Sequence, residues 1–200
     1  MSPRPRKATD DEVFAAAARA MNRLAPGELT LGEIAREAGL TAGALVQRFG
    51  SKRRLLLTMA ERFAAAAGQL IDGLRAQHAS PLAAVRAYAD CMSQLASSPA
   101  SFQRSLAYLQ IDLADSELRR HLVKQATATR LGLQKLIDGA VEQGELKDGT
   151  NAAALARTIE AMVSGSMMTW AFYRKGSAKQ WMREHMDAVL APYLTTSTRR

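Results

Sequence analysis

Apolar residues recur at the three- and four-residue spacing of amphipathic helices along almost the whole chain, and no segment alternates like a strand. Start and stop signals divide this pattern into nine expected helices. Their approximate bounds are residues 9–23, 30–39, 42–48, 51–77, 81–97, 99–113, 116–143, 151–175 and 178–191. The predicted fold class is therefore all-α.

Several of these helices carry recognisable caps at their first residue. Thr9 is followed by Glu12, and Thr30 by Glu33, so both pairs fit the capping box, in which two side chains satisfy free backbone N–H groups. Ser51 is expected to cap the long helix that follows Gly50. Ser80 and Ser98 each precede a proline, an arrangement typical of a helix start.

The stretch from Leu31 to Leu56 predicts two short helices joined by a tight turn. Gly39 falls at the turn, where glycine can adopt a left-handed conformation without steric cost. The small Ala35 lets the two helices approach closely, and Leu45 supplies an inward anchor for the second one. This spacing predicts a helix-turn-helix, and DNA binding with it.

The segment IAREAGLTAGALVQRFGSKRRLL resembles the DNA-binding signature of the tetracycline-repressor (TetR) family of bacterial transcriptional regulators, with a close match from roughly Val13 to Leu56. The chain departs from the family pattern at Val46, where a tyrosine usually touches a DNA phosphate, and at Arg48, where histidine is common. The resemblance implies a dimeric regulator, most often a repressor, that binds a palindromic operator and is released by a small molecule.

The resemblance and the helical layout together predict two domains. Residues 1–50 form a helix-turn-helix DNA-binding domain of three helices with a short basic N-terminal arm, in which Arg4, Arg6 and Lys7 can reach the DNA. Residues 51–200 form a six-helix effector-binding and dimerisation bundle, and its first helix, residues 51–77, connects the two functions.

The second helix of the motif is expected to enter the major groove. Gln47 either pairs with adenine or is an ordinary exposed residue, while Arg48 contacts a phosphate or a guanine. Lys52 begins a basic run that either binds a phosphate at the helix start or is a solvated charge run. The full predicted DNA-binding set is Thr30, Thr41, Ala42, Gly43, Ala44, Val46, Gln47, Arg48, Ser51 and Lys52.

The last two helices are the predicted dimer interface, because apolar residues occupy two faces and thus need two partners. That set is Ile159, Val163, Gly165, Trp181, Met182, Met186 and Val189; a purely intramolecular core is the alternative. Family members commonly enclose a small-molecule cavity, and methionine and aromatic side chains favour an apolar or aromatic effector. The predicted lining is Phe63, Cys91, Met92, Phe102, Tyr108, His121, Met162, Met167 and Trp170; for each of them taken singly, plain core packing is the commoner role of such a residue.

The formal net charge of +8 suits a polyanionic partner, and residues 1–57 carry half of it in little more than a quarter of the chain. Cys91 is the single cysteine, and the three histidines lack metal-ligand spacing, so no metal site or cofactor is expected. Without a phosphate-binding glycine loop or a nucleophile elbow, an enzyme is not predicted. The chain is expected to be cytoplasmic, and a helical protein–protein adaptor without specific DNA binding is the rival function.

Overall fold

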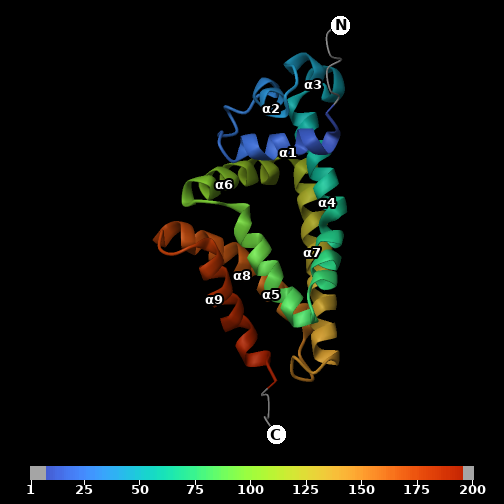
Figure 1. Ribbon diagram of the computed structural model, residues 1–200, viewed down its shortest axis with the longest axis vertical. Coiled ribbons are helices and arrows are strands. Elements are labelled where there is room, and N and C mark those ends of the chain that lie inside the picture. Colours follow the sequence, from blue (N-terminus) through green and yellow to red (C-terminus); the bar gives the residue numbers. More distant parts are fainter. Residues whose placement is uncertain (1–7, 196–200) are drawn as a thin grey trace. The chain divides into compact units, whose positions relative to one another are not determined.

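The structure, a computed structural model, describes residues 8–195 and confirms the all-α prediction (Figure 1). The only β-type pairing in this range is an isolated antiparallel bridge between Leu146 and Leu194. The α-helices are α1 (Asp10–Met21), α2 (Leu31–Ala38), α3 (Ala42–Phe49), α4 (Lys52–Gln77), α5 (Pro81–Met92), α6 (Pro99–Ala114), α7 (Ser116–Glu142), α8 (Ala152–Tyr173) and α9 (Ala178–Leu190). Short 3-10 helices follow α5 (Ser93–Leu95) and α9 (Ala191–Tyr193).

The predicted caps form at the starts of these helices. At α1 the capping box is complete, since the Glu12 amide donates to Thr9 Oγ1 at 3.2 Å and the Thr9 amide donates to Glu12 Oε2 at 2.8 Å. At α2 only half of the box is present. The Glu33 amide donates to Thr30 Oγ1 at 3.1 Å, but the Glu33 carboxylate pairs with Arg36 rather than with the cap.

Contacts divide the chain into two compact units. The first unit comprises the residues up to Arg62 together with Gln103–Arg120, and the second comprises Phe63–Phe102 together with the residues from His121 onward. The first unit is therefore larger than the fifty-residue domain expected from the sequence, because the end of α6 and the start of α7 fold with it.

A core of buried apolar residues holds the first unit together. Val13 and Phe14 of α1 pack with Ile34 of α2 and Leu45 of α3, and Tyr108 of α6 joins the same cluster. The hydroxyl of Tyr108 donates to the Leu24 carbonyl at 3.0 Å, so this side chain ties α6 to the loop that follows α1. Burial raises the pKa of Tyr108 to about 12, as expected for a phenol that is costly to ionise away from water.

The second unit has a separate and larger core. Val85 of α5, Ile137 of α7, Ile159 of α8 and Met182 of α9 are fully buried in it. Gly132 lets α7 lie close to α4, because a Cβ at this position would stand 2.9 Å from side-chain atoms of Ile71. Helix α9 packs against both α5 and α8 in this unit (Figure 1).

Candidate functional site

The α2–α3 pair has the geometry that the sequence predicts for a helix-turn-helix. Gly39 ends α2 in the left-handed region at φ 68°, and the Leu40 amide donates to the Ala35 carbonyl at 2.8 Å across the turn. Thr41 then caps α3, since its Oγ1 accepts from the Ala44 amide at 3.2 Å. The turn therefore closes within three residues and sets α3 directly against α2.

Helix α3 buries a narrow stripe and exposes the rest of its surface. Leu45 is fully buried and Phe49 is 8% exposed, and both pack into the core of the first unit. The predicted contact residues on this helix and its cap are all exposed: Thr41, Ala42, Gly43, Ala44, Val46, Gln47 and Arg48. The side chain of Val46 is 51% exposed.

Arg48 is engaged within the chain. Its Nη1 donates to the Ala8 carbonyl at 2.6 Å, and its guanidinium forms an ion pair with Asp10 at the start of α1. The guanidinium also lies 5.4 Å from the ring centroid of Phe49. Arg48 therefore joins the end of α3 to the beginning of α1, and a contact with DNA would require it to leave these partners.

The three successive cations at the start of α4 have three different environments. Lys52 Nζ donates to the carbonyls of Pro26 and Leu29, at 3.0 and 2.8 Å, and thus holds the loop between α1 and α2. Arg53 forms ion pairs with Asp115 and Glu117, where α6 meets α7. Arg54 is exposed, and within residues 8–195 its guanidinium has no hydrogen-bond or ion-pair partner. Its backbone amide donates to Ser51 Oγ at 3.2 Å, so Ser51 caps α4 as predicted.

Arg53 links α4 to the α6–α7 turn within the first unit. Its Nε donates to Asp115 Oδ2 at 2.9 Å, and its Nη2 donates to Glu117 Oε2 at 2.6 Å. Hydrogen bonding from the Leu118 amide and from Arg53 lowers the pKa of Asp115. Sequence reasoning missed this link because its partners are about sixty residues away along the chain. In the sequence, three adjacent cations indicate a local concentration of positive charge but not the partner of each side chain.

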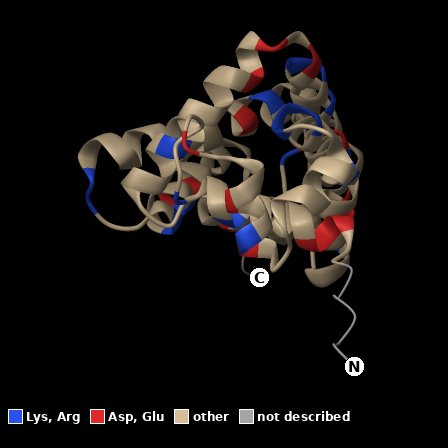
Figure 2. Cartoon of the chain, turned by 90° about the horizontal axis from the view of Figure 1, so that it is seen from above, with Lys and Arg blue, Asp and Glu red and all other residues tan. Residues whose placement is uncertain are grey.

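A second charged cluster fixes α1 against α2. Arg19 Nε donates to Glu37 Oε1 at 2.8 Å, and Arg23 also pairs with this carboxylate. The hydrogen bond from Arg19 lowers the pKa of Glu37. Figure 2 shows acidic residues interspersed among the basic ones. Near the motif, Arg19, Arg23 and Arg48 each form an ion pair with a carboxylate. Unpaired cations such as Arg54 are the ones available to an external anion.

Five of the nine residues predicted to line an effector cavity lie in or against the core of the second unit, namely Met92, Phe102, Met162, Met167 and Trp170. Tyr108 belongs to the first unit, as described above. Phe63 is 45% exposed, whereas Met167 and Trp170 are buried in the core of the second unit. The remaining five are His121, which is buried, and Cys91, Met92, Phe102 and Met162, which are partly buried.

The predicted dimer residues also have different environments. Ile159, Met182 and Met186 are at most 1% exposed and belong to the intramolecular core, so they cannot touch another chain as they stand. Val163 is buried as well, at 8% exposure. Gly165 is exposed and Trp181 and Val189 are partly so. The outward face of α8 lies elsewhere, along Ala161, Gly165, Met168 and Phe172.

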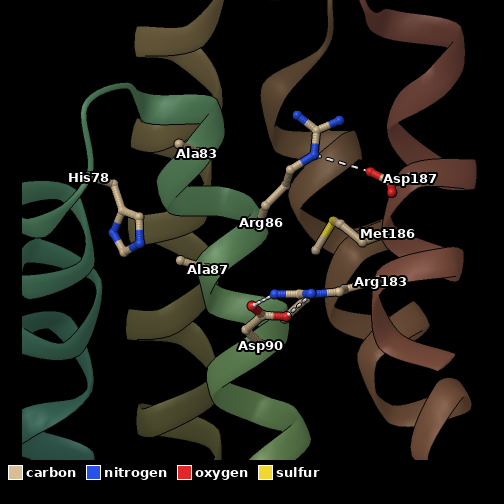
Figure 3. Close-up of a pocket in the computed structure, with 9 residues that line it drawn as sticks. His78, Ala83, Arg86, Ala87, Asp90, Arg183, Met186 and Asp187 are labelled. Carbon is tan, nitrogen blue, oxygen red and sulfur yellow. Dashed lines mark hydrogen bonds and ion pairs between the residues drawn. The ribbon is translucent and has the colours of Figure 1, made fainter. Parts of the chain in front are cut away.

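A pocket of about 350 Å³ lies between α5 and α9 in the second unit (Figure 3). Arg86 and Asp90 line it from α5, and Arg183 and Asp187 from α9, in two ion pairs that cross between the helices. Hydrogen bonding to Arg183 lowers the pKa of Asp90. None of the residues predicted to hold an effector lines this pocket, and its walls carry four charged side chains.

Two further observations concern the part of the chain that the structure covers. No helix there is long and apolar enough to cross a membrane. Between Ala8 and Thr195 no three His, Cys, Asp or Glu side chains gather in a way that could hold a metal ion. The predicted basic arm, with Arg4, Arg6 and Lys7, lies outside the described residues.

Comparisons with known proteins agree with this arrangement. Residues 13–59 match the family described as bacterial regulatory proteins, tetR family, and residues 107–186 match the tetracyclin repressor-like C-terminal domain. The two matches cover the helix-turn-helix and most of α6 to α9. No curated protein matches the chain.

Solved structures of similar fold include three whose matches cover nearly the whole chain. SmeT, the repressor of the Stenotrophomonas maltophilia multidrug efflux pump SmeDEF, has 21% identity and a TM-score of 0.67, with 96% of this chain and 93% of SmeT covered. A TetR transcription regulator from Haloarcula marismortui has 16% identity and a TM-score of 0.73, with 93% and 98% covered. Reduced NemR from E. coli has 16% identity and a TM-score of 0.75, with 95% and 100% covered.

The two family matches, the nine helices in the described range and the exposed α3 of the helix-turn-helix lead to one conclusion. This chain belongs to the TetR family of DNA-binding transcriptional regulators.

Proposed function

We propose that the protein is a repressor that binds a palindromic operator as a dimer and is released by a small effector. The observation that carries this proposal is α3, which buries only Leu45 and Phe49 and leaves its other side chains exposed to solvent. A helix of that kind can enter a major groove without unfolding any core contact. SmeT, whose fold is similar, is itself a repressor, which favours repression over activation here.

On α3 we assign base recognition to Gln47 and close approach to Gly43 and Ala44. Gln47 is exposed in the last turn of the helix, and its amide can donate to and accept from adenine at the same time. Gln47→Ala should cost about 1–3 kcal/mol at one base pair and leave other positions unchanged. Binding of a systematic set of operator variants measures this, and an unaltered base preference would exclude the assignment.

We assign the phosphate contact at the start of α4 to Arg54, because Lys52 and Arg53 are held by partners inside the first unit. Each phosphate contact releases about one counterion, so Arg54→Ala should reduce the slope of log affinity against log salt by about one. Lys52→Met is the matched control, since it also removes one cation from the same turn but should leave the slope nearly unchanged. Equal slopes for wild type and Arg54→Ala would refute this role.

The dimer contact that we propose is the outward face of α8. Its exposed residues Ala161, Gly165 and Phe172 and the partly buried Met168 recur at spacings of four, three and four, which is the pattern of a helix that packs along another helix. The side chain of Phe172 is 71% exposed in a single chain, although it is large and apolar. The small residues Ala161 and Gly165 in the first half of this stripe allow the backbones to approach closely.

Introducing a charge on this stripe tests the interface. Ala161→Glu would place a carboxylate from each chain in a close apolar contact, which disfavours the dimer. Sedimentation should then show monomers. The affinity for an operator with two half-sites should fall at least about tenfold. Gln69→Glu, at an exposed position of α4, adds the same charge outside the stripe and should leave the dimer intact. A dimer that survives Ala161→Glu would place the interface elsewhere.

For the effector, we propose an apolar or aromatic molecule held in the interior of the second unit. Met92, Phe102 and Met162 are partly buried against its core, and such side chains can rearrange around a guest molecule. A coupling of 1–3 kcal/mol between effector and operator changes affinity about 5- to 150-fold. Thermal-shift screening of apolar compounds, followed by operator titration with and without each hit, tests this step; hits that leave operator affinity unchanged would reject it.

A further inference from the structure

Another pocket, of about 240 Å³, lies within the first unit. Its walls come from the loop between α1 and α2, the start of α4, the end of α6 and the start of α7. All nine residues that line it belong to this one compact unit. An apolar cavity of about 150 Å³ is enough to hold benzene. The pocket can therefore hold a single aromatic ring with a small substituent.

Apolar and aromatic side chains form most of the pocket wall. Leu29, Tyr108 and Leu118 are at most 6% exposed. Ile111 is 41% exposed, so solvent reaches the wall at this residue. The Tyr108 hydroxyl already donates its proton to the Leu24 carbonyl and has none to offer a ligand. A wall of this kind favours an apolar ring. Its apolar and aromatic members are Pro26, Leu29, Leu56, Tyr108, Ile111 and Leu118.

Two of the three charged residues in the wall hold each other. Asp115 Oδ2 accepts from Arg53 Nε at 2.9 Å. The Oδ1 atom accepts from the backbone amides of Glu117 and Leu118, at 2.9 and 3.2 Å. Arg53 also donates to the Glu117 carboxylate, and its side chain is 52% exposed. Both oxygens of Asp115 therefore have donors, and Arg53 can complete its hydrogen bonds with water.

Lys52 is the third charged residue, and it has one proton left to donate. This half-buried side chain donates to the carbonyls of Pro26 and Leu29, and its third ammonium proton has no protein partner within residues 8–195. A polar group withdrawn from water is destabilising unless it is hydrogen-bonded. Because Lys52 Nζ is 2.8 Å from the Leu29 carbonyl oxygen, this donor adjoins the apolar wall. An oxygen on an aromatic ligand can thus accept the proton while the ring contacts the wall.

The charges around the pocket favour a neutral ligand. Two positive side chains, Lys52 and Arg53, line it. Two carboxylates, those of Asp115 and Glu117, balance them. Glu28 adds a further negative charge near the wall, which disfavours an anion. A cation would be repelled by Lys52.

We propose that this pocket is a binding site for a small neutral aromatic compound that carries a carbonyl group. The ring lies among Leu29, Tyr108 and Leu118, and the carbonyl oxygen accepts the third proton of Lys52. Such a ligand contacts both the loop that leads into α2 and the start of α7, so it stabilises the first unit. The site lies in a different unit from the effector site proposed above, and its occupation does not depend on DNA. Its failure would therefore leave the proposed function untouched.

Isoleucine methyl NMR locates the ligand. Of the five isoleucines, Ile111 alone lines the pocket, whereas Ile137 and Ile159 lie in the core of the second unit. In protein labelled with ¹³C at the isoleucine δ1 methyl groups, acetophenone is titrated, and the Ile111 signal is assigned with Ile111→Val. Saturable movement of Ile111 is expected, and Ile137 and Ile159 report separately on the effector site of the second unit. An Ile111 signal that does not respond would refute the proposal, whatever the other two do. Benzoate should bind more weakly than acetophenone, and equal or tighter binding would overturn the neutral class.

A pocket-filling variant tests the site. Leu56→Trp enlarges one residue of the wall and should weaken acetophenone binding, followed at Ile111, at least about tenfold. Leu113→Trp is the matched control, because it makes the same substitution in the first unit at a residue that is 50% exposed and outside the pocket. It should leave binding unchanged. Undiminished binding in Leu56→Trp would place the ligand elsewhere and refute the site.

A second variant tests the hydrogen bond. Lys52→Met removes the donor and keeps an unbranched side chain. It should weaken acetophenone binding about tenfold more than the binding of isopropylbenzene, which has the same shape without the oxygen. Comparing two probes in one variant cancels any general change in the first unit, and keeps the test decisive should Leu56→Trp not fold. Equal losses for both compounds would overturn the assignment of Lys52 and of the carbonyl group.

Discussion

Replacing Gly43 of α3 by alanine should affect folding stability and DNA binding in opposite directions. Gly43 is the second residue of α3, and a Cβ added there would meet nothing nearer than Thr41 Oγ1, at 4.0 Å. Gly43→Ala therefore causes no clash within the chain. Because glycine is a poor helix former, alanine should stabilise the unit by about 0.5–1 kcal/mol.

The same methyl group would project from the surface that we propose to face the DNA. In a major-groove contact that depends on close backbone approach, it would have to displace the helix or the base edge. We expect operator affinity to fall about fivefold or more, equivalent to about 1 kcal/mol or more, while the unfolding midpoint rises by about 1–4 °C. Calorimetry and an operator titration at fixed salt measure the two effects on the same preparation.

Gly68→Ala is the control for this experiment. Gly68 lies inside α4 with open space around its Cβ position, so it should give a similar gain in stability and no loss of operator affinity. A Gly43→Ala protein that is more stable and binds the operator as tightly as wild type would show that α3 does not approach DNA at this residue. A less stable protein would show that the local helix geometry is misjudged.

Three further predictions concern stability. Lys52→Met should lower the free energy of unfolding by about 1.5–3 kcal/mol, because it removes charged hydrogen bonds to the Pro26 and Leu29 carbonyls. Urea unfolding measures this difference. An unchanged free energy of unfolding would show that Lys52 does not stabilise the loop between α1 and α2. Gly39→Ala should cost about 1–2 kcal/mol, since alanine would have to adopt φ 68°, and an unshifted thermal midpoint would count against it. Burial raises the pKa of Tyr88 to about 12, so its contribution to stability is complete below pH 10 and is lost as the pH rises from 10 to 12. The free energy of unfolding should fall by up to about 3 kcal/mol over this range because of Tyr88. In Tyr88→Phe the free energy of unfolding should therefore depend less steeply on pH between 10 and 12, and the remaining dependence should come from Tyr108. An unchanged pH dependence in urea unfolding would contradict this.

The sequence by itself determined the local features of this protein. Helix caps at Thr9, Ser51 and Ser80, and the left-handed turn at Gly39, depend on residues within four positions of one another. Helical periodicity likewise marks the inward residues of α3, because Leu45 and Phe49 are spaced to share one face. The fold class and the helix-turn-helix could be predicted because they follow from such short-range rules.

Only the tertiary structure decided how the charged and apolar residues are used. Lys52, Arg53 and Arg54 are alike in sequence, yet the first two have partners more than twenty positions away and the third has none in the described chain. Met182 and Met186 were expected on a dimer surface but lie in the core, because a helix that is apolar on several sides does not reveal which side its own chain covers. The pocket between α5 and α9 joins residues about one hundred positions apart, and no local pattern encodes such a juxtaposition.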